Sequence, residues 1–284
     1  MSHPITVLWT VPRSVSTSFE RMMSARGDHT VVDEPFSVPY YYGPERRSPR
    51  YDETLPESSA QEVLASLERA AEERPVFVKD MAYQAAELLG PDLLARFRNC
   101  FLVRDPAATL RSLGKRWPDF TDEEGGWARL DEASRLVESL GQPLVVLDAD
   151  RLCADPAGVV AAWCEQMDLP YDGSALTWEP GMREEWSLWS DWHASTMQST
   201  GFEELRPPPP PPGPDQPRLQ EAYAAALPVY ERLSALAICA AGVWAGAGGS
   251  RGSAANVVGE PGGCLDILGP HFRGPRARPG LRRS

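Results

Sequence analysis

Cysteine is sparse in this 284-residue chain, and its few copies form no recognisable pattern. The five cysteines are odd in number, lie far apart and include no C-x-x-C pair. Disulfide frameworks and zinc knuckles both need paired cysteines, so the sequence predicts neither of them. We therefore expect a protein of the reducing cytoplasm.

Long apolar runs are lacking as well. The longest stretch, Ala235 to Ala247, is too short to cross a bilayer, which takes about 20 apolar residues. The chain opens directly on a strand pattern, without the basic and apolar leader typical of an exported protein. With 42% hydrophobic residues, the sequence predicts a globular protein with a substantial core and no membrane partner.

Positive charge is scarce too. The formal net charge of −12 argues against nucleic acid as the partner, because a phosphate backbone demands a clustered basic surface. Only two of the 28 basic residues are lysines, Lys79 and Lys115. GC-rich coding tends to replace lysine by arginine. We therefore expect the two remaining lysines to have a role that arginine would not fill.

The segment Ile5 to Met22 is the most informative part of the chain. An apolar strand pattern runs into a polar loop, and a helix pattern follows at once. The first N–H groups of a helix have no intrahelical partner, so this arrangement makes a cradle for a phosphate or sulfonate. Four hydroxyls and one arginine exceed what an ordinary helix cap needs, which favours an anion site over a capped helix. These side chains are Arg13, Ser14, Ser16, Thr17 and Ser18.

Four further strand patterns alternate with helix patterns along the chain. The strands are expected at His29 to Val32, Val76 to Val78, Cys100 to Val103 and Leu144 to Leu147, and the helices at Ser58 to Arg74, Leu88 to Phe97, Ala107 to Trp117, Thr121 to Leu140 and Asp155 to Met167. Such alternation predicts an α/β fold, a parallel β-sheet flanked by helices in three layers, with ligands at the carboxyl ends of the strands.

The remaining segments set the domain limits. Residues 1–240 are predicted to form a single domain, in which the loop from Ser37 to Pro56 is long enough to cover a substrate. Six consecutive prolines, Pro207 to Pro212, predict an extended loop at 207–214, before helical periodicity resumes at Gln216 to Ala237. Residues 241–284 lack periodicity and are predicted to be a disordered tail.

Polar residues follow each predicted strand, where a ligand would bind. Asp33-Glu34 follows the second strand, Lys79-Asp80 the third and Arg104 the fourth. In a parallel sheet these junctions meet at one edge. Arg104 and Ser112, which lies two turns into the next helix, could grip a second phosphate. The alternative is a salt-bridged cap with a surface serine.

These motifs resemble those of the sulfotransferase superfamily that uses 3′-phosphoadenosine 5′-phosphosulfate (PAPS). The run Pro12-Arg13-Ser14-Val15-Ser16-Thr17 stands where that family binds the 5′-phosphosulfate, with Val15 in place of the usual glycine. Arg104 and Ser112 match the spacing of its 3′-phosphate motif. The resemblance covers residues 1 to about 205 and implies a P-loop-like fold, related to that of nucleotide kinases, with PAPS as cofactor and no metal.

The resemblance also implies a base. Bacterial and carbohydrate-type members often carry a Glu-Pro pair after the second strand, whose carboxylate deprotonates the acceptor hydroxyl, and Glu34-Pro35 matches it. Asp33, Asp80 and His193 stay open as alternative bases.

Further site residues follow in the same way. Arg13 would neutralise the sulfonate, and Lys79 would stabilise the negative charge that builds on the leaving phosphate. Ser199 and Thr200 resemble a nucleotide-contacting loop that some members carry late in the domain.

The implied reaction moves a sulfonyl group from PAPS to a hydroxyl of a small-molecule acceptor and releases 3′-phosphoadenosine 5′-phosphate. Tyr40 to Tyr42 and four tryptophans between positions 178 and 192 indicate a site with aromatic walls, although such residues also serve as plain core. The excess of arginine over lysine is typical of GC-rich bacterial coding. We therefore expect a role in the biosynthesis of secondary metabolites such as antibiotics. The acceptor and the oligomeric state are left open.

Two other functions compete with this one. A nucleotide-dependent phosphoryl-transfer enzyme would want a G-x-x-x-x-G-K-[ST] loop, and the sequence has none. A non-catalytic module would bind a nucleotide, or a protein through the Trp- and Pro-rich segments. Tight binding of adenosine 3′,5′-bisphosphate without Mg²⁺ would distinguish the sulfotransferase from both.

Overall fold

The fold is built on one parallel sheet. The computed structural model describes residues 2–55, 59–183, 186, 188–193 and 196–239. Five parallel strands lie in the order β2-β3-β1-β4-β5 and span Ile5–Thr10 (β1), Thr30–Asp33 (β2), Val76–Met81 (β3), Arg98–Val103 (β4) and Val145–Asp148 (β5). The predicted five-stranded parallel sheet is thus confirmed. The expected disordered tail, 241–284, lies outside the described residues.

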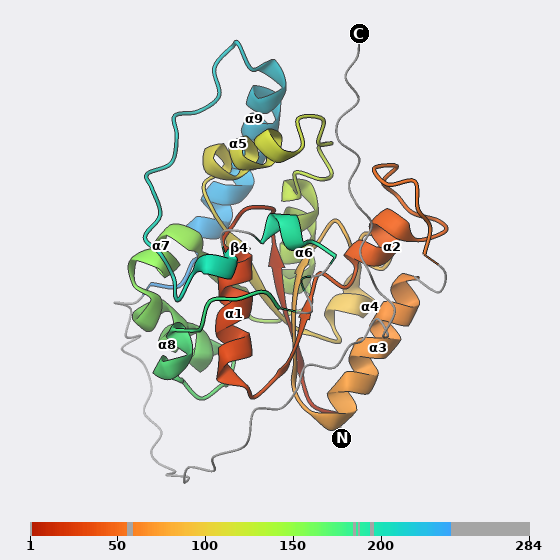
Figure 1. Cartoon of the computed structure of the whole chain (residues 1–284), viewed down its shortest axis with the longest axis vertical. Helices are drawn as coiled ribbons and strands as arrows, with labels where there is room; N and C mark the ends of the chain where they lie inside the picture. Colours follow the sequence, from red (N-terminus) through yellow and green to blue (C-terminus); the bar gives the residue numbers. More distant parts are fainter. Residues whose placement is uncertain (1, 56–58, 184–185, 187, 194–195, 240–284) are drawn as a thin grey trace.

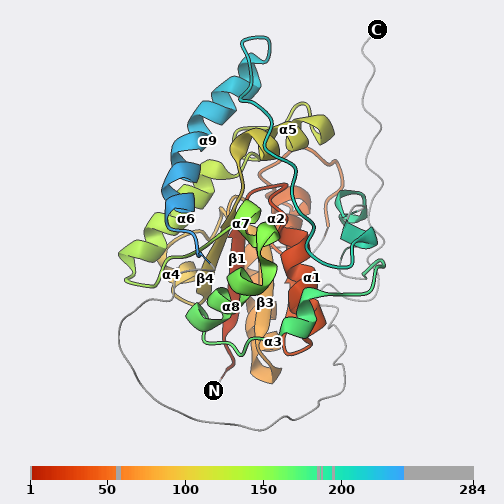
Figure 2. The same cartoon turned by 90° about the vertical axis from the view of Figure 1, so that its left-hand side faces the viewer.

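Helices cover both faces of the sheet (Figures 1 and 2). One layer is formed by α1 and α8, whose residues pack on one face of the sheet with strand residues such as Leu8. The other face carries Val7 and Trp9, and the helices that pack on it are α3, α4, α5, α6 and α9. The helices span Ser16–Arg26 (α1), Ser37–Tyr42 (α2), Ala60–Glu73 (α3), Pro91–Leu94 (α4), Pro106–Arg116 (α5), Trp127–Ser139 (α6), Ala149–Ala154 (α7), Pro156–Gln166 (α8) and Pro217–Ala235 (α9), with 3₁₀ turns at Gly173–Leu176, Ser190–Trp192 and Thr196–Gln198.

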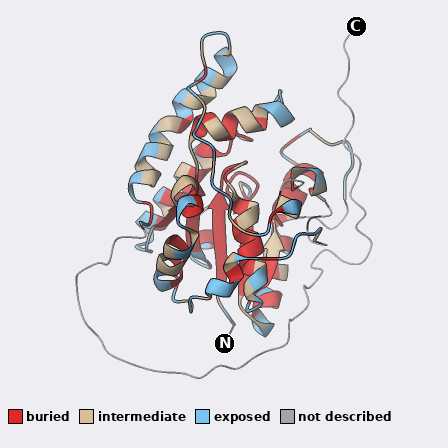
Figure 3. Cartoon of the chain, turned by 60° about the vertical axis from the view of Figure 1, so that its left-hand side comes forward, coloured by how far each residue is buried: buried red, intermediate tan, exposed pale blue. Residues whose placement is uncertain are grey.

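The strands are buried on both faces, which explains why they read as continuous apolar runs in the sequence. All six residues of β1 are buried, and burial follows the strands through the centre of the molecule (Figure 3). Among the described residues, no helix has the length and apolar content needed to cross a membrane.

Two helix predictions were wrong in extent because glycines interrupt them. The segment Leu88 to Phe97 contains only the short α4, which follows Gly90 in an extended conformation. The predicted helix at Thr121 to Leu140 begins only at Trp127, because Gly126 takes a left-handed conformation (φ 83°) at the N-cap.

Two short helices were missed altogether. α2 lies inside the segment that was expected to be a loop, and its six residues are all buried. α7 follows β5 without a connecting loop, because Asp148 ends the strand and at the same time caps the helix through the N–H groups of Asp150 and Arg151.

The chain order creates a switch point at β1. From β1 the chain passes to β2 and returns through β3 on one side, and it then continues to β4 and β5 on the other side. Ligands of open parallel sheets bind outside the carboxyl end of such a strand. The loop from Pro12 to Val15 occupies this place.

Candidate active site

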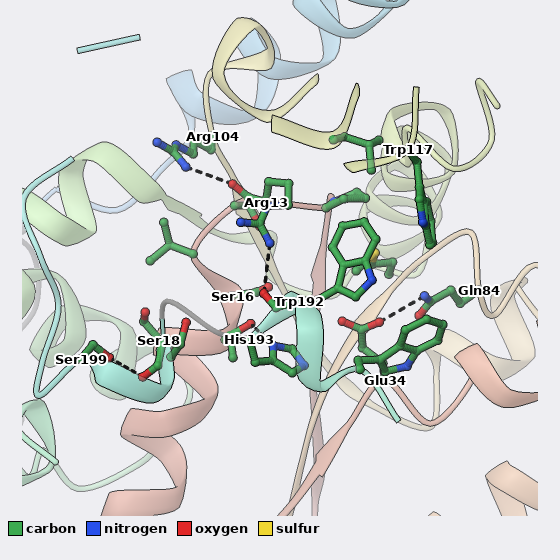
Figure 4. Close-up of a pocket in the computed structure, with 18 of the residues that line it drawn as sticks. Arg13, Ser16, Ser18, Glu34, Gln84, Arg104, Trp117, Trp192, His193 and Ser199 are labelled. Atoms are coloured by element: carbon green, nitrogen blue, oxygen red, sulfur yellow. Dashed lines mark hydrogen bonds between the residues drawn. The ribbon is translucent and has the colours of Figure 1, made fainter. Parts of the chain in front are cut away.

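A cavity of about 230 Å³ opens at the carboxyl ends of the strands. Residues that follow β1, β2, β3 and β4 all contribute to it, so the four junctions do meet at one place. Its described lining residues are Pro12, Arg13, Ser14, Val15, Ser16, Thr17, Ser18, Glu34, Tyr41, Met81, Tyr83, Gln84, Arg104, Leu113, Trp117, Trp189, Trp192, His193, Thr196, Ser199, Gly201, Glu203 and Leu205. In Figure 4, Arg13 and Arg104 lie on one side, Glu34, Gln84 and Trp117 on the other.

The loop after β1 is held in a strained conformation. Arg13 (φ 67°) and Val15 (φ 71°) both adopt the left-handed backbone that favours glycine, which costs about 1–3 kcal/mol per residue. Val15 is the N-cap of α1 and gives it no side-chain cap. The backbone N–H groups of Val15, Ser16 and Thr17 donate to no described residue. The strained loop thus presents a helix start to an anion.

Arg13 lies over this helix start. Its Nε donates to Ser112 Oγ (3.0 Å) and its Nη1 to the Trp192 carbonyl (3.2 Å). Burial, followed by the charges of Arg116 and Arg104, lowers the pKa of Arg13. Within the described part of the chain, no carboxylate lies within ion-pair distance of its guanidinium. An anion in the cavity would supply the missing counter-charge.

Arg104 reinforces the same site. Its Nη1 donates to the Arg13 carbonyl (3.1 Å), while its buried Nε has no partner among the described residues. Two arginines beside one helix start repel each other, so this arrangement fits a ligand with more than one negative charge.

Some hydroxyls of the loop bond within the protein, and others face the cavity, where a ligand could use them. Ser14 is fully buried and bonds back to the Val11 carbonyl (2.8 Å), which tightens the loop. Thr17 Oγ1 pairs with His193 Nδ1 (3.2 Å). Ser16 and Ser18 line the cavity.

Three predicted site residues stand back from the described cavity wall. Ser112 does not line the cavity and instead holds Arg13. Thr200 is exposed outside it, while its neighbour Ser199 lines it, accepts from Trp178 Nε1 (3.2 Å) and donates to the Thr196 carbonyl. Lys79 is fully buried behind Glu34.

Lys79 forms the centre of a buried charge cluster. Its Nζ contacts Asp33 Oδ1 and Glu34 Oε1 (2.6 Å), with Glu20 Oε2 at 3.9 Å. Burial alone would lower the pKa of Lys79, but Asp33, Glu34 and Glu20 outweigh burial and raise it. The lysine therefore stays charged and fixes the carboxylates around it.

Glu34 is the member of this charge cluster that lines the cavity. It lies just after β2 in a left-handed conformation (φ 43°), and its side chain is 8% exposed. Lys79 binds one carboxylate oxygen, and Gln84 Nε2 donates to the other (3.2 Å). A carboxylate has about four lone-pair sites, so capacity to accept a further proton or hydrogen bond is left.

The four candidate bases differ in access. Glu34 and His193 line the cavity. Asp33 is held by Lys79 and His193 behind it. Asp80 is fully buried and accepts from the N–H groups of Phe36 (2.9 Å) and Met81 (2.7 Å); burial, followed by the charge of Glu34, raises its pKa well above the ordinary value.

His193 links the loop to the charge cluster. Its Nε2 lies 3.2 Å from Asp33 Oδ2, and its ring packs at 4.9 Å on Trp186. Burial would raise the pKa of Asp33, but Lys79 and then His193 outweigh it and hold the pKa well below its ordinary range. An ionised carboxylate can only accept, so His193 must carry a hydrogen on Nε2. When neutral, His193 then accepts the Thr17 hydroxyl at Nδ1.

Aromatic side chains form the other wall, and sequence reasoning found only part of it. The tyrosines of α2 and the tryptophans after position 178 were anticipated as a group, whereas Trp117, at the end of α5, and Gln84, three residues after β3, were missed. Gln84 is a polar residue shortly after a strand, and this pattern could have marked it. Among the described residues, no group of three or more His, Cys, Asp and Glu is placed to hold a metal.

A family model described as a sulfotransferase domain matches residues 5–237. Because this is most of the chain, the protein belongs to the sulfotransferase domain family, as its motifs predicted. Two solved structures are similar to this chain at a distance. The sulfotransferase domain from the Synechococcus PCC 7002 olefin synthase is 17% identical (TM-score 0.48, covering 79% of this chain and 96% of that one), and the one from the curacin biosynthetic pathway is 15% identical (TM-score 0.47, 82% and 98%).

Two curated proteins of Arabidopsis thaliana match over 198 residues, or 68% of this chain. They are branched-chain-amino-acid aminotransferase-like proteins 2 and 1, which are 29% and 30% identical to it. The match covers 35% and 36% of their lengths, so the chain spans about a third of these relatives.

Proposed function

We propose that this sulfotransferase uses PAPS as donor and transfers its sulfonyl group to a hydroxyl of a small-molecule acceptor. The observation that carries the proposal is the pair of arginines, Arg13 and Arg104, which flank one helix start without a carboxylate partner among the described residues. A nucleotide with phosphates at both its 5′ and 3′ positions supplies two anionic ends for them.

The residues present fit this donor. The N–H groups of Val15 to Thr17 and the hydroxyls of Ser16 and Ser18 would hold the 5′-phosphosulfate, with Arg13 above it. Arg104 would bind the 3′-phosphate, and Ser112 would position Arg13 through the bond to its Nε. Ser199 shapes the cavity wall on this side, and Thr200 lies next to it. PAPS supplies a sulfonyl group on a good leaving phosphate; the protein orients it and neutralises charge.

Glu34 is the proposed base. It lines the cavity on the side opposite Arg13 and Arg104, where an acceptor hydroxyl would face the sulfonate. Lys79 and Gln84 fix both of its oxygens, so the carboxylate is preorganised for proton abstraction. Lys79 then acts mainly through Glu34, since Nζ lies within the carboxylate cluster.

The names of the plant relatives raise aminotransferase chemistry as an alternative. A Schiff-base lysine needs a lowered pKa and access to its cofactor. Of the two lysines, Lys79 is buried among carboxylates that raise its pKa, and Lys115 is exposed and does not line the cavity. The site of this chain therefore favours sulfonyl transfer.

Calorimetry without Mg²⁺ tests the donor assignment. We expect adenosine 3′,5′-bisphosphate to bind the whole chain in the presence of a chelator and to bind at least 30-fold more weakly to Arg13→Ala. Arg96→Ala is the matched control, because the Arg96 side chain forms an exposed ion pair with Glu68 and does not line the cavity. Mg²⁺-dependent binding of ATP with no binding of the bisphosphate would support a kinase instead.

Labelled PAPS tests the transfer. Appearance of the label in a small hydroxylated acceptor, without added metal, is the expected result. The cytoplasmic location and a role in secondary-metabolite biosynthesis remain predictions, for which the cellular acceptor must be identified.

A further inference from the structure

Away from the helix start, the cavity wall is apolar and largely aromatic, and its Trp192 reaches back to Arg13. Five aromatic rings contribute to it, from α2, the turn after β3, the end of α5 and the segment from Trp189 to Trp192. These wall residues are Tyr41, Met81, Tyr83, Trp117, Trp189 and Trp192. Flat rings favour a ligand that can pack against them.

Three of the polar side-chain atoms of this wall are already used within the protein. The hydroxyls of Tyr41 and Tyr83 bond to each other (3.0 Å), and Trp189 Nε1 donates to Ser37 Oγ (3.0 Å). A carbohydrate would bring several hydroxyls that find few partners here. Since each buried unpaired hydroxyl costs binding free energy, the wall selects against sugars.

The tryptophan rings do not form an open cage for a cation. The guanidinium of Arg50 lies 4.1 Å from the ring centroid of Trp117, and those of Arg116 and Arg13 lie 5.2 and 5.8 Å from that of Trp192. Their charges would repel an ammonium ligand, although the rings alone would attract one. A carboxylate ligand would in turn meet Glu34 on this side.

Gln84 offers one free hydrogen-bonding atom on the same side. It is 4% exposed and lines the cavity, and its Nε2 must face Glu34, because an amide oxygen there would repel the carboxylate. Its Oε1 is buried and has no partner among the described residues. An orphan acceptor beside the base fits a second donor of the ligand.

We propose that the acceptor is a small, neutral aromatic compound with two adjacent hydroxyls, one of which reacts. This inference rests on the proposed function. The reacting hydroxyl faces Glu34, and the neighbouring hydroxyl donates to Gln84 Oε1. In the transfer, the bond between sulfur and the bridging phosphate oxygen breaks as a bond from sulfur to the phenolic oxygen forms. The phosphate takes the electron pair, and Glu34 takes the proton.

A panel of probes tests this class. Equilibrium dialysis without donor compares 2,3-dihydroxynaphthalene with 2-naphthol, glucose, choline and 4-hydroxybenzoate, and assays with labelled PAPS then compare their kcat/KM values. We expect the diol to bind at least threefold more tightly than 2-naphthol, and both to exceed the others at least tenfold. Preferred binding and turnover of glucose, choline or 4-hydroxybenzoate would overturn the inference.

Two variants test the hydrogen bond to Gln84 and the aromatic packing separately. Gln84→Met should erase the preference for the diol over 2-naphthol, a ratio that does not depend on how well Glu34 works. Trp117→Leu should weaken the binding of both probes at least fivefold and leave bisphosphate affinity unchanged. Trp127→Leu is the matched control, because Trp127 packs in the core and does not line the cavity. An unchanged diol preference in Gln84→Met would contradict the role of Gln84.

One outcome separates this inference from the proposed function. If the diol binds with the expected preference and PAPS transfers nothing to it, the ligand class stands and the donor assignment falls. If the bisphosphate binds and labelled sulfate passes preferentially to glucose, the donor stands and the ligand class falls.

Discussion

The two sides of the cavity differ in charge and in how far the protein satisfies their polar groups. The side around Arg13 leaves charged and polar groups without partners among the described residues and keeps two residues in strained, left-handed backbone conformations. On the aromatic side, the hydroxyls of Tyr41 and Tyr83 and the indole N–H of Trp189 are satisfied internally, while Gln84 Oε1 has no partner among the described residues. Unsatisfied groups cost stability in the free protein and recover it when an anion binds. Under the proposed function, the first side binds the charged donor and the second side binds the acceptor.

The largest effect is expected from Arg13→Ala. Loss of one preorganised donor to a developing charge typically costs ~3 kcal/mol, so turnover should fall at least a hundredfold. Steady-state kinetics with PAPS measures this, and the Arg96→Ala control should behave like the wild type. If Arg13→Ala kept the wild-type turnover, the side around Arg13 could not be the side that binds the charged donor.

Glu34→Gln should affect the chemical step and spare donor binding. The amide keeps the shape of the side chain and cannot take a proton, so kcat should fall about a hundredfold. Adenosine 3′,5′-bisphosphate should bind within about threefold of the wild-type affinity in calorimetry. If the variant kept its kcat, the base would have to be sought at His193, which is the other candidate on the wall.

Acid should weaken the buried cluster behind Glu34. Because Lys79 and His193 depress the pKa of Asp33 in the folded protein, the unfolded chain binds more protons there as the pH falls below about 4. The stabilisation from Asp33 is present above that pH and is lost below it. Chemical denaturation should show a wild-type advantage over Asp33→Asn, on the order of 2 kcal/mol near pH 6, that shrinks towards pH 2. An advantage that stays constant with pH would contradict the ion pair.

The smallest effect is expected from Val15→Gly. Relief of a left-handed β-branched residue gains about 1–2 kcal/mol, and the flexibility of glycine in the unfolded chain offsets about half of it. Thermal unfolding should therefore shift upwards by up to about 3 °C, with bisphosphate affinity retained. A marked loss of stability would mean that the packing of Val15 against the core outweighs the strain.

The sequence predicted the features that depend on local pattern. Apolar runs located all five strands, and polar residues directly after them located the loop at Arg13 to Ser18, Glu34 and Arg104. Local pattern failed where one residue changes the backbone, as Gly126 does at the start of α6.

Features that depend on strand order could not be predicted in this way. Lys79 meets Asp33 because β2 and β3 are neighbours and the register pairs these two residues. No periodicity reveals which strands are adjacent. The bond from Arg13 to Ser112 and the place of Trp117 likewise depend on how α5 packs beside the first loop.

The central claim is that Arg13 and Arg104 grip the two anionic ends of one nucleotide. The most direct measurement is the ratio of the affinities for adenosine 3′,5′-bisphosphate and adenosine 5′-monophosphate, in the wild type and in Arg104→Ala. We predict a wild-type preference of at least 30-fold for the bisphosphate that falls to about threefold or less in the variant. Equal affinity of the wild type for both nucleotides would contradict the account.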